Sequence, residues 1–249
     1  MASLVIPRQL TSQPQGAVEI DWSNPLTLGL VFAWIPGHPE ITTGKLATTS
    51  LASIAGAVVG VAAANSPTQR NNEWDGTFCT TSDYAGTGDF TMAVLANPAS
   101  SSAGVVEHLF AQKNDAGGSP YAQACLMAHS ADDFSHAGGS VAFITYSSTV
   151  SGVAYPALCD GKYHLFMGKR YGTVMQMHID GVPLTPVGRT LLGITQASSR
   201  YVGVGCAGNQ STNGARDGSA FAAMWNRALS DAEAASIAAN PWQIFKVSE

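Results

Sequence analysis

The chain has 249 residues, and only 12% of them carry a charged side chain, about half of the roughly 25% usual in soluble domains. Its formal net charge is −5, and it has no run of Lys or Arg. Nucleic acid and anionic membrane surfaces are therefore poor partners. A weakly charged surface suits packing against neighbouring subunits, because neutral polar groups cost less to desolvate than charges do.

Residues 1–16 are expected to form an extended arm. They show neither helical nor strand periodicity, and Pro7 and Pro14 interrupt them. Residues 17–249 are expected to form a single domain, since β-sandwiches of this length often fold as one unit. The apolar groups of the arm predict that it docks on a partner subunit, and they are Leu4, Val5, Ile6 and Leu10.

Two targeting signals are not expected in this chain. Its start lacks a basic segment followed by a long apolar stretch, so nothing directs it to a secretion pathway. The apolar run Leu51 to Ala64 is shorter than the roughly 20 residues that span a bilayer. No membrane anchor is predicted.

From residue 17 onward, short β-type runs alternate with clusters of Gly, Pro, Asn and Asp. No long helical pattern intervenes, so we predict an all-β fold, a sandwich or a barrel, and not a βαβ fold. The predicted strands are Val18 to Trp22, Leu28 to Ile35, Ala57 to Ala63, Phe90 to Ala96, Val106 to Gln112, Tyr121 to His129, Val141 to Tyr146, Tyr163 to Lys169, Val174 to Ile179, Tyr201 to Cys206 and Ala220 to Trp225.

Two local signals are sharper than the rest. The run Val174 to Ile179 alternates in polarity and leads into Asp180-Gly181, the kind of pair that a tight hairpin turn requires. Ser230 is followed three residues later by Glu233, which predicts a capped helix from Ser230 to Ala239. Asn240-Pro241 ends that helix.

Four ordered motifs resemble laminin-G-like, concanavalin A-like jelly-roll domains. Thr87-Gly-Asp-Phe-Thr-Met-Ala-Val94 resembles an early strand of that family, and Asp160 to Gly168 resembles its aromatic-His strand. Met175 to Val182 resembles the next strand, which ends in Asp-Gly, and Asp217 to Glu233 resembles the closing strand and capped helix. The resemblance covers about Trp22 to Glu233 and implies an antiparallel β-sandwich, a jelly roll, with one short C-terminal helix.

The two ends of the chain add a narrower resemblance. Gln13 to Leu26 and Ala239 to Phe245 look like the flanks of laminin-G-like proteins encoded among tailed-bacteriophage structural genes. This resemblance implies a non-enzymatic virion protein, a capsid decoration, fibre or tail component, made in the bacterial host cytoplasm. It would pack on other virion proteins and on copies of itself. The alternatives are a glycan-binding adhesin or receptor-binding domain and, less favoured, a polysaccharide-degrading enzyme.

Candidate catalytic residues are few. Glycan-cleaving enzymes of this superfamily place carboxylates at alternate positions of one strand, so that both face the same groove. Glu19 and Asp21 have this spacing, but Ser23 occupies the third position, and the pair is interpreted as the solvent face of a first strand. No Gly-x-Ser-x-Gly sequence indicates a serine nucleophile.

Metal and cofactor signals are also weak, and no cofactor is expected. The histidines have no spacing typical of a metal site, and His164 is interpreted as a half-buried, hydrogen-bonded residue. Loop oxygens could hold calcium in principle, although such clusters more often form turns; the candidates are Asn114, Asp115, Asn209, Asn213 and Asp217.

Tryptophans and cysteines complete the candidate set. Trp22, Trp34 and Trp74 would stack on sugar rings if they were exposed, but core or interface packing is the favoured interpretation. The four cysteines are Cys79, Cys125, Cys159 and Cys206, and no Cys-x-x-Cys pair occurs among them. They are predicted to be free thiols in the core.

Overall fold

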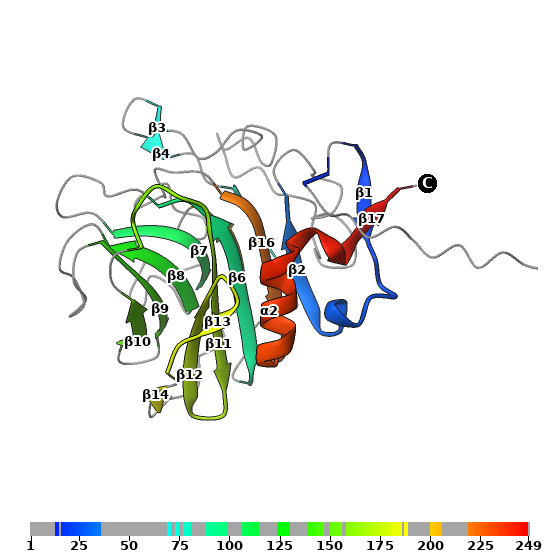
Figure 1. The fold of residues 1–249 in the computed structure, drawn as a ribbon. Helices are drawn as coiled ribbons and strands as arrows, with labels where there is room; N and C mark the ends of the chain where they lie inside the picture. The colour runs from blue at the N-terminus through cyan, green and yellow to red at the C-terminus, as the bar shows by residue number, and fades with distance from the viewer. Residues whose placement is uncertain are drawn as a thin grey trace, which may run out of the picture.

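A computed structural model describes residues 13–14, 16–35, 69–70, 73–74, 77–80, 88–98, 106–114, 124–129, 139–146, 150–155, 158–185, 187–188, 200–205 and 219–248. Within these ranges the chain folds into two large antiparallel sheets, with α2 (Asp231–Ala239) lying beside one of them (Figure 1). The predicted fold class, an antiparallel β-sandwich with a short helix near the C-terminus, is confirmed.

The first sheet has seven strands. From one edge to the other its order is β13 (Val182–Pro183), β12 (Val174–Ile179), β11 (His164–Tyr171), β6 (Phe90–Ala96), β16 (Ser219–Trp225) and β2 (Leu30–Trp34), and β14 (Val187–Gly188) also pairs with β12. Strands from both ends of the chain therefore meet in one sheet.

The second sheet has six strands. Its order is β10 (Val150–Tyr155), β9 (Ser140–Tyr146), β8 (Ala124–His129), β7 (Val106–Asn114), β15 (Arg200–Val204) and β5 (Thr77–Thr80). Two small ribbons accompany the sandwich. They pair β1 (Val18–Ile20) with β17 (Phe245–Val247) and β3 (Gln69–Arg70) with β4 (Glu73–Trp74).

The main core lies between the two sheets, where side chains of alternate residues interdigitate. Phe90 of β6 meets Phe143 of β9 edge to face, with ring centroids 5.9 Å apart. Gly168 on β11 allows this packing, because a Cβ atom at that position would lie 2.3 Å from the Phe143 ring. Burial of such aromatic and aliphatic groups is the main source of folding free energy here.

The opposite face of the seven-stranded sheet is also covered. Residues of α2 and of the 3-10 helix η3 (Pro241–Ile244) pack on Leu165, Ala223 and Trp225 in a second apolar cluster. Both faces of the central strands are consequently buried, which explains the nearly continuous apolar run of Phe90–Ala96. It also buries Gln176 and His178, whose polarity in an alternating strand would ordinarily predict exposure.

Most strand predictions that fall on described residues are confirmed, with shifted ends. Phe90 to Ala96 and Val174 to Ile179 match the observed strands at both ends. Asp180 and Gly181 have φ values of 52° and 81°, so the predicted hairpin turn is present between β12 and β13. The predicted strand Ala57 to Ala63 lies outside the described residues. Among the helices of the described ranges, none is long and apolar enough to cross a bilayer.

The cysteine prediction is confirmed where the structure describes the side chains. Cys125 and Cys159 are buried thiols outside any disulfide. Burial raises the pKa of the Cys125 thiol far above its usual range, which makes it unreactive at neutral pH. The side chain of Cys79 and all of Cys206 lie outside the described part of the chain.

Candidate functional site

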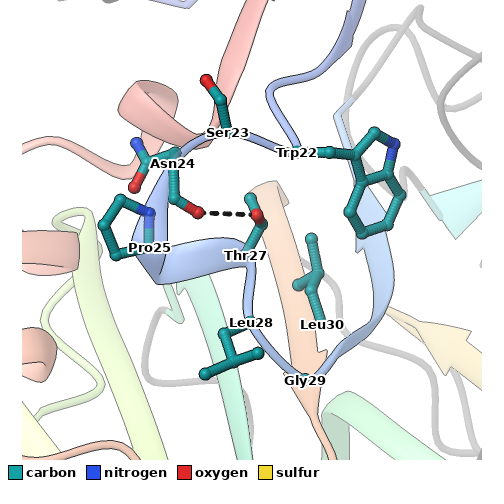
Figure 2. Close-up of a pocket in the computed structure, with 8 residues that line it drawn as sticks. All are labelled: Trp22, Ser23, Asn24, Pro25, Thr27, Leu28, Gly29 and Leu30. Atoms are coloured by element: carbon teal, nitrogen blue, oxygen red, sulfur yellow. Dashed lines mark hydrogen bonds between the residues drawn. The ribbon is translucent and has the colours of Figure 1, made fainter.

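The segment between β1 and β2 curls into a surface pocket with a volume of about 490 Å³. Figure 2 shows its wall, in which Trp22 and Leu30 stand on one side and Asn24 and Pro25 on the other. The complete lining is Trp22, Ser23, Asn24, Pro25, Thr27, Leu28, Gly29 and Leu30. All eight residues belong to one short stretch, so the conformation of this loop determines the shape of the pocket.

Side-chain hydrogen bonds fix the first half of the loop. Asp21 accepts from Ser23 N at 3.1 Å and from Ser23 Oγ at 2.5 Å, which forms a tight turn. Asn24 then caps the 3-10 helix η1 (Pro25–Thr27), because its Oδ1 accepts from Leu26 N at 2.9 Å. Its Nδ2 donates to Gln243 O at 2.8 Å and ties the loop to η3.

Residues at the end of β16 and just after it fix the second half of the loop. Trp225 Nε1 donates to Leu26 O at 2.7 Å, and Arg227 Nε donates to Leu28 O at 2.6 Å. Gly29 has a φ of 75°, and a Cβ atom there would lie 2.7 Å from Asn226 Oδ1. Only glycine meets both requirements without strain. The pocket is therefore preorganised by bonds to residues about 200 positions away in the sequence.

The loop surface that a ligand could contact is mainly apolar. Trp22 is 44% exposed and Leu28 is 72% exposed, whereas most large apolar side chains of the described residues are buried. The Asn24 amide and the Thr27 hydroxyl already bond within the loop and to η3, so they serve the fold first. The exposed Ser23 hydroxyl donates to Asp21 and keeps lone pairs that can accept a hydrogen bond.

The pocket is also uncharged. None of its eight lining residues carries a charge. Arg227, which follows β16 and bonds to Leu28 of the loop, is neutralised by Glu233, with Nη1–Oε2 and Nη2–Oε1 distances of 3.0 and 2.7 Å. That guanidinium lowers the pKa of Glu233 to about 2, so the ion pair persists across the usual pH range. An exposed indole in an uncharged hollow suits a neutral ligand with an apolar face.

The three tryptophans that the sequence suggested for stacking have different environments. Trp22 is exposed and lines the pocket, as stacking requires. For Trp34 the favoured interpretation, core packing, is confirmed, because it is only 4% exposed and belongs to the core between the sheets, so it is not available for stacking. Its strand forms the edge of the seven-stranded sheet. Trp74 lies in β4, but its side chain is outside the described part of the structure.

Glu19 and Asp21, the two carboxylates at alternate positions, lie in different environments. Glu19 is exposed and bonds to Lys246 at 2.8 Å across the β1–β17 ribbon, as a solvent-facing residue should. Asp21 contradicts the same interpretation, because it is buried and accepts the hydrogen bonds that form the turn. The error arises because β1 ends at Ile20, so Asp21 no longer follows the strand alternation.

Several other candidates lie wholly or partly outside the described residues. Asp115, Asn209, Asn213 and Asp217 are among them, and only the backbone of Asn114 is described, at the end of β7. Within the described ranges no group of three potential metal ligands occurs. The arm residues Leu4, Val5, Ile6 and Leu10 are likewise not described. These predictions remain untested.

His164 has the structural role that the sequence suggested. Its Nδ1 lies 2.7 Å from Asp180 Oδ2, and its side chain is mostly buried. Asp180 Oδ1 also accepts from Leu165 N at 2.8 Å. The Asp of the hairpin turn thus fastens the turn to the neighbouring strand, which gives the aromatic-His and Asp-Gly motifs one shared physical basis.

A second polar cluster, missed by sequence reasoning, lies beneath α2. Lys169 Nζ and His178 Nε2 lie 2.6 and 3.0 Å from Asp231 Oδ1. Lys169 also donates to Leu229 O at 3.2 Å. Asp231 opens the helix, so the cluster docks the helix on the sheet. Alternating polar residues on β11 and β12 next to a capped helix are the signal that could have indicated it.

Comparisons with known proteins give a likeness of fold only. No family profile and no curated protein matches the sequence. The chain is similar to three solved structures. A Trypanosoma rangeli sialidase in complex with a difluorinated sugar acid gives 14% identity and a TM-score of 0.48, over 68% of this chain and 26% of that one. A structure of botulinum neurotoxin type C, described as interacting with two ganglioside molecules, gives 8% identity and a TM-score of 0.48, over 69% of this chain and 41% of that one.

The third structure is a CBM40 domain of Ruminococcus gnavus IT-sialidase bound to α2,3-sialyllactose. It gives 15% identity and a TM-score of 0.48, over 62% of this chain and 84% of that one. This chain therefore spans about a quarter of the sialidase and two fifths of the neurotoxin chain. At these identities and TM-scores the likeness transfers neither ligand nor activity to this chain.

Proposed function

We propose that this protein is a non-catalytic glycan-binding domain whose site is the pocket beside Trp22. The exposed indole of Trp22 carries the proposal, because the apolar face of a sugar ring stacks on an exposed aromatic ring while its hydroxyl groups stay hydrated. Leu28 extends the apolar surface, and Ser23 adds an exposed hydroxyl on the rim.

The preorganised loop supports this function. A loop already held by hydrogen bonds to β16 and η3 loses little conformational freedom when it binds, and this preserves affinity for a small contact area. The uncharged lining favours neutral sugars over sialic or uronic acids, since the nearby Arg227 guanidinium is already paired with Glu233. We therefore propose a neutral oligosaccharide as the ligand.

A glycan array tests the proposal with wild-type protein and Trp22→Ala. We expect the wild type to bind a set of neutral glycans and to lose that binding in Trp22→Ala, because a central tryptophan contributes about 2 kcal/mol or more to binding. Trp34→Phe is the matched control. It alters a buried indole and should keep the same pattern. Binding by both variants, or a wild-type pattern limited to sialylated glycans, would contradict the proposal.

A further inference from the structure

Arg227 contacts the pocket loop without lining the pocket. Its Nε donates to Leu28 O at 2.6 Å, whereas the lining residues all lie within residues 22–30. The stem of Arg227 also lies against Gly29, since a Cβ atom built there would be 3.2 Å from Arg227 Cγ and 3.3 Å from Cδ. This one side chain therefore contacts two successive residues of the loop.

Leu28 depends on such contacts because the core does not hold it. The residue is 72% exposed, so packing contributes little to its position. Hydrogen bonds fix its backbone instead, with N donating to Pro25 O at 3.1 Å and O accepting from Arg227. The next carbonyl, that of Gly29, accepts from Asn226 N at 2.8 Å. Of these three bonds, only the one from Arg227 is made by a side chain, so a substitution can remove it.

Contacts at both ends of Arg227 fix the direction of its side chain. Thr91 Oγ1 on β6 donates to Arg227 O at 2.9 Å and accepts from Leu229 N at 2.9 Å, which anchors the backbone after β16. Glu233 of α2 binds both terminal nitrogens of the guanidinium, which restricts rotation of its plane. With the backbone and the guanidinium both held, Nε is directed at the Leu28 carbonyl.

We propose that Arg227 is a positioning residue of the glycan pocket, which sets ligand affinity by holding Leu28 and Gly29 in the binding conformation through its Nε–H. This role rests on the proposed function and extends the site to a side chain outside the pocket lining. A loop that is held before binding loses less conformational freedom on binding, so release of this corner weakens affinity. Glu233 takes part indirectly, because it orients the guanidinium.

Arg227→Lys separates the bond to Leu28 from the ion pair. Lysine has a methylene group where arginine has Nε–H, and its ammonium group lies one atom further along, from where it can still pair with Glu233. The variant therefore keeps the charge and removes the donor to Leu28 O. We expect its Kd for a neutral oligosaccharide chosen from the array, measured by calorimetry, to rise about tenfold, while its Tm stays close to that of the wild type. A residue that served only the ion pair would tolerate lysine.

Phe143→Leu is the control for a general loss of stability. Phe143 packs between the two sheets, against Phe90 and over Gly168, so its replacement loosens the core and leaves the loop bonds in place. We expect its Tm to fall and its Kd to stay at the wild-type value. An equal rise of Kd in Phe143→Leu and Arg227→Lys would overturn the proposal, because affinity would then follow stability.

Hydrogen exchange at the Leu28 amide supplies a readout that needs no sugar. This amide donates to Pro25 O, so we expect it to exchange faster in Arg227→Lys than in the wild type once the corner is released. Equal exchange in the two proteins would overturn the proposal.

Trp22→Ala distinguishes failure of this role from failure of the proposed function. Loss of binding in Trp22→Ala together with a wild-type Kd in Arg227→Lys would overturn the role of Arg227 and leave the pocket as the glycan site. Absence of binding by the wild type, or full binding by Trp22→Ala, would overturn the proposed function and the role of Arg227 with it.

Discussion

His178 links the stability of the domain to pH at the scale of a single residue. Its side chain is fully buried, and burial lowers its pKa below the ordinary 6.5, an effect that the hydrogen bond to Asp231 opposes. The native state therefore favours neutral imidazole, while the unfolded chain takes up a proton below about pH 6.5. The contribution of neutral His178 to the free energy of unfolding is fully present above that pH. It is lost as the pH falls from there towards the lowered pKa of His178 in the native state.

We expect the free energy of unfolding to decrease between about pH 6.5 and 5, and to do so less steeply in His178→Gln. Chemical denaturation at a series of pH values measures it, with His164→Gln as the control for an outer histidine. Parallel pH profiles for wild type and His178→Gln would show that His178 does not carry the effect.

Single residues also mark how far sequence reasoning reaches. Asp180-Gly181 was predictable as a turn because the requirement for positive φ is local. The environments of Trp22 and Trp34 were not predictable, since both are aromatic residues near short strands. Trp34 is covered because β2 joins the seven-stranded sheet and the Trp34 side chain lies in the core between the sheets, while Trp22 lies on the loop before that strand.

At the scale of elements, the capped start of α2 connects the helix to the pocket loop. Ser230 and Glu233 form the predicted capping box, and Glu233 also binds Arg227, whose Nε reaches Leu28 O. The box was readable from the sequence because its spacing is local. The link to Leu28 was not, because it joins residues about 200 positions apart.

Replacing Glu233 should therefore lower the free energy of unfolding by more than the loss of a helix-capping bond alone. We expect Glu233→Ala to lower the free energy of unfolding by about 1–2 kcal/mol, because it removes both the cap bond and the paired guanidinium contact. Urea denaturation measures the loss. Glu233→Gln keeps an acceptor for Ser230 N and should lose less, and equal losses in the two variants would contradict a role for the cap bond.

The whole molecule could be predicted in outline from its sequence. Short β-type runs separated by turn residues sufficed for an all-β fold and for most strands on described residues, and the family resemblance narrowed the fold to a sandwich. The three-layer arrangement could not be deduced, because it depends on α2 and η3 packing over β6, β11 and β16. This covering hides the polar residues Lys169 and His178, which strand alternation alone would place in solvent.

Location on a bacteriophage particle and the role of residues 1–16 remain predictions. Deleting the arm should leave the Tm of the isolated domain nearly unchanged and reduce incorporation into particles or oligomers, because an arm that docks only on assembly adds little to the monomer. Thermal unfolding and particle composition measure the two effects. Unfolding of the truncated monomer would place the segment in the core, and absence of the chain from purified particles would exclude a virion role.

Titration of the protein with a neutral oligosaccharide from the array, followed through the indole N–H signals of its tryptophans by NMR, tests the central claim most directly. Trp22→Phe assigns the signal of Trp22. We predict that this signal shifts saturably with the ligand, while that of the core residue Trp34 stays in place. Saturable binding that leaves the Trp22 signal unmoved would contradict the account.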